Sequence, residues 1–142
     1  FERFVEYCDS RQSKEKISQR SEEMHLKLVR RVRSNPHIIG VRNVDKSWQE
    51  IEWEKDRNII TESDVIFLDK DHQIYLIECK GVTRTGRGIS EQLIRAYRFV
   101  KEEFNISPWL IGVRYSPVKP LHIQRVYPSA KDLFAKSNHP SF

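Results

Sequence analysis

The chain is poor in the residues that build zinc and disulfide sites. Only two of its 142 residues are cysteines, Cys8 and Cys79, and they stand far apart in no spacing typical of a metal site. Its five histidines are scattered and include no His-x-x-x-His pair, which argues against a zinc site. Two isolated cysteines fit a protein that works in a reducing, intracellular environment.

Long apolar runs and targeting signals are also missing. No stretch approaches the roughly 20 apolar residues that a membrane-spanning helix needs. The first residues show no signal-peptide pattern. We therefore expect no membrane contact and an intracellular location, in the cytoplasm or nucleoid.

Charge is plentiful and slightly unbalanced. The chain has 25 Lys and Arg against 20 Asp and Glu, a net charge of +5 and a pI of about 9.3. A basic balance suits an anionic partner, nucleic acid first, although many soluble proteins are equally basic. The length fits a single domain. We expect a core over about residues 12–127, an N-terminal extension over 1–11, and a C-terminal helix and tail over 128–142.

Hydrophobic periodicity predicts alternating helices and strands. The N-terminal residues 1–11 are either a short helix packed on the domain or part of a preceding element. Beyond them, helices are expected at 12–33, 89–104 and 129–136, and strands at 38–44, 47–53, 65–68, 74–77, 108–113 and 121–126, with a polar connection at 54–61. Because the strands at 65–68 and 74–77 are apolar on both faces, they belong inside a sheet covered by helices. The predicted fold class is α/β, with a mixed sheet flanked by helices.

The stretch from Asp64 to Lys80 predicts a hairpin with charges gathered at one end. If residues 70–72 form a three-residue loop, the numbers of opposed residues sum to 142, and Asp64 faces Glu78. Such a loop normally includes a residue in the left-handed conformation. Like charges directly opposite each other repel. A hard cation such as Mg²⁺, held by carboxylate oxygens, would turn that repulsion into binding.

The spacing of Asp64, thirteen further residues and then Glu78-Cys79-Lys80 resembles the PD-(D/E)xK nuclease superfamily. This superfamily includes restriction endonucleases, archaeal Holliday-junction resolvases and RecB-like nucleases. Glu78 to Lys80 is the single Glu-x-Lys of the chain, and it falls at the end of a strand-like run. The resemblance covers about residues 12–115. It implies a restriction-endonuclease-like core with the order α-β-β-β-α-β. Ser63 stands where members of the family often have Pro.

The resemblance also implies roles for these residues. Asp64 and Glu78 would bind one or two Mg²⁺ or Mn²⁺ ions, and the backbone carbonyl of Cys79 would be a further ligand. Lys80 would orient or help to deprotonate the attacking water, or stabilise charge on the phosphate. Metal ions supply the nucleophile and the charge neutralisation that phosphodiester hydrolysis needs.

Two more residues are catalytic candidates by the same resemblance. Many members add an acidic residue from the first helix, and Glu22 lies nearer the apolar face of the predicted helix than Glu23. RecB-like members have a Gln followed four residues later by a Tyr. Here Gln92 and Tyr97 are five apart, so Gln92 is a candidate and the pair departs from that pattern.

Basic residues follow the motif directly and suggest a DNA-binding surface. Arg84 and Arg87 lie in a glycine-rich loop, and Arg95 and Arg98 lie on the polar side of the next helix, where they could contact phosphates. The alternative is that they are ordinary solubilising arginines. A second basic cluster comprises Arg30, Arg31 and Arg33.

The expected function is a metal-dependent DNA endonuclease. The small size leaves little room for sequence recognition, which favours structure-selective cleavage like that of the resolvases, non-specific cleavage, or a nuclease domain of a larger protein. The resemblance to the resolvases implies a homodimer as one option. The alternative is a non-catalytic nucleic-acid-binding or protein-interaction module on the same fold. The sequence leaves RNA open as a substrate.

Overall fold

We describe a computed structural model of the chain, in which residues 1–12, 23–81, 87–116 and 119–126 are described. For residues 23–24, 81, 87–90, 115–116 and 119–126 the description is limited to the backbone. The expected C-terminal helix at 129–136, and the tail around it, lie outside the described residues.

The described residues form helices and strands in alternation. In chain order they are α1 (Glu2–Gln12), α2 (Glu23–Ser34), the short 3₁₀ helix η2 (Pro36–Ile39), β1 (Val44–Lys55), β2 (Asn58–Asp69), β3 (Ile74–Gly81), α3 (Arg87–Phe104), β4 (Trp109–Ser116) and β5 (Lys119–Val126). Among these helices, none is both long enough and apolar enough to cross a membrane.

The strands form one five-stranded mixed sheet in the order β1-β2-β3-β4-β5. Three neighbouring pairs are antiparallel, and β3 and β4 are parallel because α3 carries the chain back between them. The predicted α/β class is confirmed. From α2 to β4 the elements follow the order α-β-β-β-α-β that we expected.

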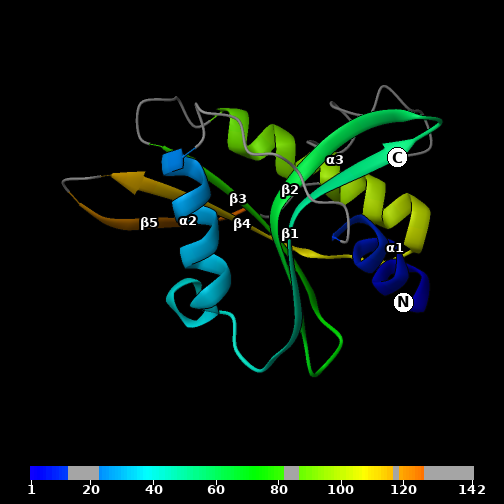
Figure 1. Cartoon of the computed structure of the whole chain (residues 1–142), viewed down its shortest axis with the longest axis horizontal. Coiled ribbons are helices and arrows are strands. Elements are labelled where there is room, and N and C mark those ends of the chain that lie inside the picture. Colours follow the sequence, from blue (N-terminus) through cyan, green and yellow to red (C-terminus); the bar gives the residue numbers. More distant parts are fainter. Residues whose placement is uncertain (13–22, 82–86, 117–118, 127–142) are drawn as a thin grey trace.

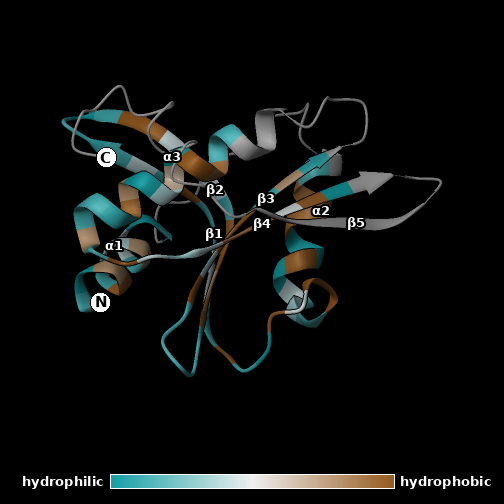
Figure 2. Ribbon diagram, turned by 180° about the vertical axis from the view of Figure 1, so that it is seen from behind, coloured by the Kyte–Doolittle hydropathy of each residue, from teal (hydrophilic) through white to brown (hydrophobic). Residues whose placement is uncertain are grey.

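Helices cover both faces of the sheet, as the apolar central strands required. One core cluster joins α1 and α3 to one face, with Phe4, Trp53 and Val100 among its fully buried members. A second cluster joins α2 and η2 to the other face, around Val29 and Val32. Figure 1 shows α2 apart from α1 and α3, which lie together. In Figure 2 the central strands are coloured as hydrophobic and the helices are polar on parts of their surface.

The register predicted for the central hairpin is confirmed. Strands β2 and β3 pair from Leu68 with Ile74 to Val65 with Ile77, and the numbers of each opposed pair sum to 142. The backbone N–H of Asp69 donates to the carbonyl of Gln73 at 3.0 Å, which closes the three-residue loop. Within it His72 has φ of 63°, the left-handed conformation that such a loop demands.

The strand predicted at 38–44 is wrong. Pro36 starts the 3₁₀ helix η2 instead, because its ring presets a helical φ and its missing N–H is no loss in a first turn. Gly40 then ends the helix with φ of 80°, a left-handed conformation that glycine adopts without steric cost. The apolar Ile39 and Val41 are buried in the α2 cluster, which explains the apolar pattern without a strand.

The polar connection predicted at 54–61 is also wrong. β1 continues to Lys55 and β2 begins at Asn58, so the strands are joined by a two-residue turn, Asp56 and Arg57. Both turn residues have positive φ, 52° and 67°. This is the geometry of the tight hairpin turn whose usual signal is Asn-Gly or Asp-Gly. Here the second residue of the turn is Arg57 and not Gly, so the sequence does not show the usual pattern.

Residues 2–12 are a helix that packs on the domain, the first of the two possibilities left open by the sequence. The hydroxyl of Tyr7 donates to the carbonyl of Glu52 and accepts from the N–H of Glu54, both at 2.8 Å. The side-chain oxygen of Gln12 accepts from the N–H of Gln49 at 2.7 Å. These contacts occupy backbone groups of β1, which is an edge strand and would otherwise expose them.

We predict that Phe4→Ala lowers the free energy of unfolding by about 3–5 kcal/mol, because this ring is fully buried between α1, β1 and α3. Urea denaturation measures the change. Phe1→Ala is the matched control: this ring is 42% exposed, and its loss should change stability by less than about 1 kcal/mol. Similar, small effects of both substitutions would show that α1 is not part of the core.

Candidate active site

The candidate site lies where β2 and β3 separate. Their pairing stops at Val65 and Ile77, one residue before Asp64 and Glu78. If the register continued, the N–H of Cys79 would face the carbonyl of Ser63. Instead it donates to Asp64 Oδ2 at 2.7 Å. The carboxylate thus replaces a backbone acceptor and holds the two strands together at the point where the ladder ends.

The neighbouring strand is distorted at the same level. In β1, Glu50 has φ of 53°, and the register on either side puts it opposite Asp64. Trp48 and Ile51 both enter the core formed with α1 and α3, although residues three apart on a regular strand point to opposite faces. The side chains of β1 therefore change faces of the sheet at Glu50. A left-handed conformation costs a non-glycine residue on the order of 1–2 kcal/mol, which the surrounding packing must offset.

The carboxyl groups of Asp64 and Glu78 meet inside the protein. Asp64 is 4% exposed and Glu78 is 5% exposed. Burial raises the pKa of Glu78 well above its usual range, and the charge of Asp64 and a side-chain hydrogen bond with it raise that pKa further. The two carboxyl groups of the predicted pair thus lie close enough for the charge of one to act on the other. A divalent cation bound by both would relieve this repulsion.

Two further charges act on this pair. Lys80 is half-buried and its positive charge lowers the pKa of Glu78, against the larger effects of burial and Asp64. Glu62 is also half-buried, and its negative charge raises that pKa. Along β3, Lys80 lies two residues beyond Glu78 and opposite Arg114 of the parallel strand β4. The charges of Glu62 and Lys80 thus act on the carboxyl pair in opposite directions.

The residue that the sequence analysis missed is His25, in the first turn of α2. Its Nε2 lies 3.2 Å from Asp64 Oδ2 and 3.1 Å from the backbone oxygen of Cys79. Both facing atoms are hydrogen-bond acceptors, so Nε2 must carry a proton in this arrangement. His25 thereby bridges two of the atoms expected to bind a metal ion. A signal was present: Leu28, Val29 and Val32, three, four and seven positions later, form the buried stripe of α2.

Of the other catalytic candidates, the structure places only one. Glu22 lies outside the described residues. Gln92 lies on α3, half-buried, and its side-chain oxygen is buried without a hydrogen-bond partner in the part of the chain that the structure describes. A buried acceptor left unpaired costs about 1–3 kcal/mol. The catalytic role of Gln92 stays a prediction.

The predicted DNA-binding arginines are placed in part. Arg84 lies outside the described residues, and Arg87 begins α3 with its side chain not described. Arg95 is exposed on α3, and its charge acts on the half-buried Arg98 one turn later, whose pKa is lowered chiefly by burial. These two guanidinium groups therefore lie close together on the helix that follows the motif.

The second basic cluster is divided. Arg30 and Arg31 are exposed on α2. Arg33 instead donates to Ser47 Oγ at 3.1 Å, to the Ser47 carbonyl at 3.1 Å and to Gln49 Oε1 at 3.2 Å. It fastens α2 to β1 and is not available to phosphate in this arrangement.

The donor atoms at the site fit a hard cation. Asp64 and Glu78 offer carboxylate oxygens and Cys79 offers a backbone carbonyl, the oxygen ligands that Mg²⁺ prefers. Within residues 1–12, 23–81, 87–116 and 119–126, no three His, Cys, Asp or Glu side chains are grouped as a metal site. The carbonyl is thus needed to complete a set of three. The thiol of Cys79 is buried in the α2 cluster, and its pKa is raised by that burial.

Comparison with known proteins adds little to this geometry. No family model and no curated protein matches the chain. The crystal structure of a repair endonuclease from Pyrococcus abyssi superimposes over 88% of this chain with a TM-score of 0.37 and 20% sequence identity. The chain spans 46% of the length of that endonuclease. A superposition this loose does not define a shared family.

We predict that Glu78→Gln makes the metal-free protein more stable at neutral pH. The raised pKa of Glu78 means that folding binds a proton, so stability falls as pH rises from the unfolded pKa near 4.3 toward the folded one. An amide carries no charge and can still donate to Asp64. We therefore expect Glu78→Gln to raise the free energy of unfolding at pH 7–8, where the parent protein must either bury a charge or bind a proton.

Urea denaturation in EDTA between pH 4 and pH 8 measures this gain. It should shrink toward pH 4, where Glu78 is protonated in both states. Glu102→Gln, an exposed carboxylate on α3, is the control and should show no such trend. A variant that is less stable than the parent at pH 8 would contradict the burial of an uncompensated carboxyl pair.

Proposed function

We propose that the chain is a metal-dependent endonuclease that hydrolyses phosphodiester bonds in DNA. The observation that carries this proposal is the buried contact of Asp64 with Glu78 at the end of β3, next to the Cys79 carbonyl and Lys80. Protein interiors rarely keep two carboxyl groups in contact, because burial and repulsion both oppose it. A divalent cation bound by both groups would neutralise their charges and so stabilise the pair.

Each residue has a defined part in the proposed reaction. Asp64, Glu78 and the Cys79 carbonyl would hold Mg²⁺ or Mn²⁺. When bound, the metal lowers the pKa of a water molecule and neutralises negative charge on the phosphate. Lys80 would orient that water or offset charge on the scissile phosphate, since its ammonium group follows Glu78 on the same strand.

His25 would hold two of the proposed ligands in place. Its Nε2 lies against Asp64 Oδ2 and the Cys79 carbonyl, whereas Asp64 Oδ1 takes no part in this contact and would be available to the ion. The first turn of α2 would thereby help to orient ligands that come from β2 and β3.

The motif and the element order from α2 to β4 support membership of the PD-(D/E)xK superfamily. We extend the proposal to structure-selective cleavage of branched DNA by a homodimer, on the sequence resemblance to the resolvases. The alternative, a non-catalytic nucleic-acid-binding or protein-interaction module, is opposed by the retention of Asp64, Glu78 and Lys80 together.

We predict that the protein nicks or cuts DNA when Mg²⁺ or Mn²⁺ is present and not in EDTA. Supercoiled, linear, single-stranded and four-way-junction DNA are the substrates, and gel electrophoresis follows the products. Asp64→Asn, Glu78→Gln and Lys80→Ala should each lower the rate at least about a hundredfold, the usual scale for loss of a group that assists proton transfer or metal binding. Faster cleavage of the junction than of the linear duplex is expected.

Two results separate the proposed site from the alternatives. Glu102→Gln, which removes a carboxylate outside the site, should cleave like the parent protein. DNA binding without cleavage of any substrate would favour the non-catalytic module. Full activity in Asp64→Asn would show that another site performs the chemistry.

We also predict that Arg95→Ala weakens DNA binding at every sequence and lowers the slope of log K against log salt by about 1, because one phosphate contact is lost. Fluorescence anisotropy in 50–200 mM salt, with EDTA to prevent cleavage, measures both quantities. Arg30→Ala removes an equally exposed arginine from α2 and is the matched control. Equal effects of the two substitutions would remove the assignment of the DNA surface to α3.

A further inference from the structure

Positive charge is concentrated in one continuous segment of the chain. Residues 24–44, from the first turn of α2 through η2 to the beginning of β1, contain five Lys and Arg and no Asp or Glu. Removing these five from the 25 basic residues of the chain leaves 20, which equals the number of its acidic residues. The excess positive charge of the protein therefore lies within this segment.

The arginines of this segment have different surroundings. Arg33 is engaged within the protein, because its three hydrogen bonds hold α2 to β1. The side chains of Arg30, Arg31 and Arg42 are exposed, and none of them forms a hydrogen bond or ion pair within the described part of the chain. A guanidinium group presents its donors as a planar fork that matches a phosphate group. Arg30 and Arg31 therefore give the outer face of α2 the free donors that a phosphate-binding surface needs.

This face of α2 begins beside the candidate active site. His25, in the first turn, contacts Asp64, and Arg30 and Arg31 follow five and six residues later on the same helix. At a rise of about 1.5 Å per residue, they lie roughly 8–9 Å from His25 along the helix axis. A nucleic acid held at the proposed metal ligands would therefore reach these arginines if it continued along α2.

The arginines of α3 lie on the other side of the sheet. The core cluster of α2 is on one face and that of α3 is on the opposite face. α3 also begins near the site, because only residues 82–86 separate it from the end of β3. Figure 1 shows α2 and α3 running away from this end of the sheet in different directions. Arg95 on α3 and the two arginines of α2 thus define two basic surfaces that begin at one site.

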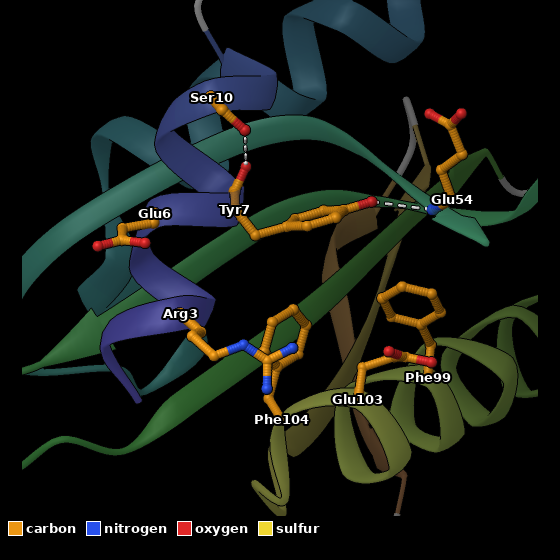
Figure 3. Close-up of a pocket in the computed structure, with 8 residues that line it drawn as sticks. All are labelled: Arg3, Glu6, Tyr7, Ser10, Glu54, Phe99, Glu103 and Phe104. Carbon is orange, nitrogen blue, oxygen red and sulfur yellow. Dashed lines mark hydrogen bonds between the residues drawn. The ribbon is translucent and has the colours of Figure 1, made fainter. Parts of the chain in front are cut away.

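The far end of α3 does not suit a phosphate backbone. Three carboxylates, those of Glu6, Glu54 and Glu103, line the pocket between α1, the end of β1 and α3 (Figure 3). The cations beside them are already engaged, since Arg11 pairs with Glu54 and Lys55 pairs with Glu103. Carboxylates repel phosphate, so DNA that extends beyond the site has a more favourable path along α2.

A linear duplex cannot follow both basic surfaces without bending. The persistence length of DNA is about 150 base pairs, so a duplex arm of a few helical turns is stiff. A duplex that lies along α3 would have to bend around the end of the sheet to reach α2. At a branch point, duplex arms leave in different directions without such bending.

We propose that the outer face of α2 binds a second duplex arm of branched DNA while a first arm lies against α3. The proposal rests on the DNA endonuclease function proposed above and identifies the surface that distinguishes branched from linear DNA. In this arrangement Arg30 and Arg31 contact phosphates of the second arm. The branch point lies at the candidate active site, where both helices begin.

Fluorescence anisotropy in EDTA tests this proposal with two labelled DNAs. One is a four-way junction, and the other is a linear duplex with the sequence of two of its arms, on which Arg95 should matter more than Arg30. The double substitution Arg30→Gln, Arg31→Gln should lower the affinity for the junction at least about fivefold more than the affinity for the linear duplex. For the junction, it should also lower the slope of log K against log salt by about 2 for each bound protomer, since each lost phosphate contact lowers it by about 0.9.

A charge-matched variant controls for the loss of positive charge. Arg57→Gln, Lys70→Gln also removes two exposed cations, but from turns outside α2 and α3, and should affect both DNAs by the same factor. Hydroxyl-radical footprinting of the junction then locates the contacts. The α2 variant should protect half as many arms as the parent protein.

Three results would each overturn the proposal: equal losses of affinity for the two DNAs in the α2 variant, equal effects of the two double variants, or no preference of the parent protein for the junction. A polyglutamate peptide is the third probe. If the α2 variant loses affinity for this peptide but keeps its preference for the junction, the face binds an acidic protein segment and the proposal is wrong. Junction binding that depends on Arg30 and Arg31 in a protein that cleaves no DNA would refute the proposed nuclease but not the arm-binding surface.

Discussion

The contact between the buried carboxyl groups of Asp64 and Glu78 is the constraint on which the rest of the site depends. It is unfavourable by itself, since both groups lose water and their charges repel each other. The structure compensates by placing donors around it: the N–H of Cys79 and the imidazole of His25 both face Asp64 Oδ2. Each donor comes from a different element, so β2, β3 and α2 must meet at this point for the pair to exist.

The sheet supplies the rigidity that such a contact needs. Strands β2 and β3 are packed on both faces, and they separate where the carboxyl groups begin. The turnover of β1 at Glu50 lets the β1–β2 ribbon leave the plane of β3 without losing its own pairing. α1 holds that ribbon through Tyr7 and Gln12. Contacts of α1 on one face of the sheet thus help to hold β1 and β2 where β2 separates from β3, beside Glu78.

The central hairpin could be predicted because its register depends only on residues close together in the sequence. A charged three-residue loop between two apolar runs determines which residues oppose each other, and a single slip would have exposed the apolar faces. The turn at Asp56 and Arg57 could not be predicted, because the pairing of Lys55 with Asn58 on either side imposes positive φ on residues that are not the usual Asn-Gly or Asp-Gly. His25 was missed although its spacing to Leu28, Val29 and Val32 puts it on the buried stripe of α2, because that spacing does not say which residue of the sheet it faces. Its role appears when α2 is placed against β2.

Charge is sorted along α3 in a way that composition alone conceals. The net charge of +5 is the difference between 25 basic and 20 acidic side chains, so it does not say where each sign lies. At the end of the helix, Arg3 lies over the Phe104 ring and Glu103 pairs with Lys55, so the charges there are matched within the chain. Arg95 and Arg98 stand about one turn apart nearer the middle of the helix, and Arg95 is exposed. An anionic polymer would therefore contact the middle of this helix in preference to its end.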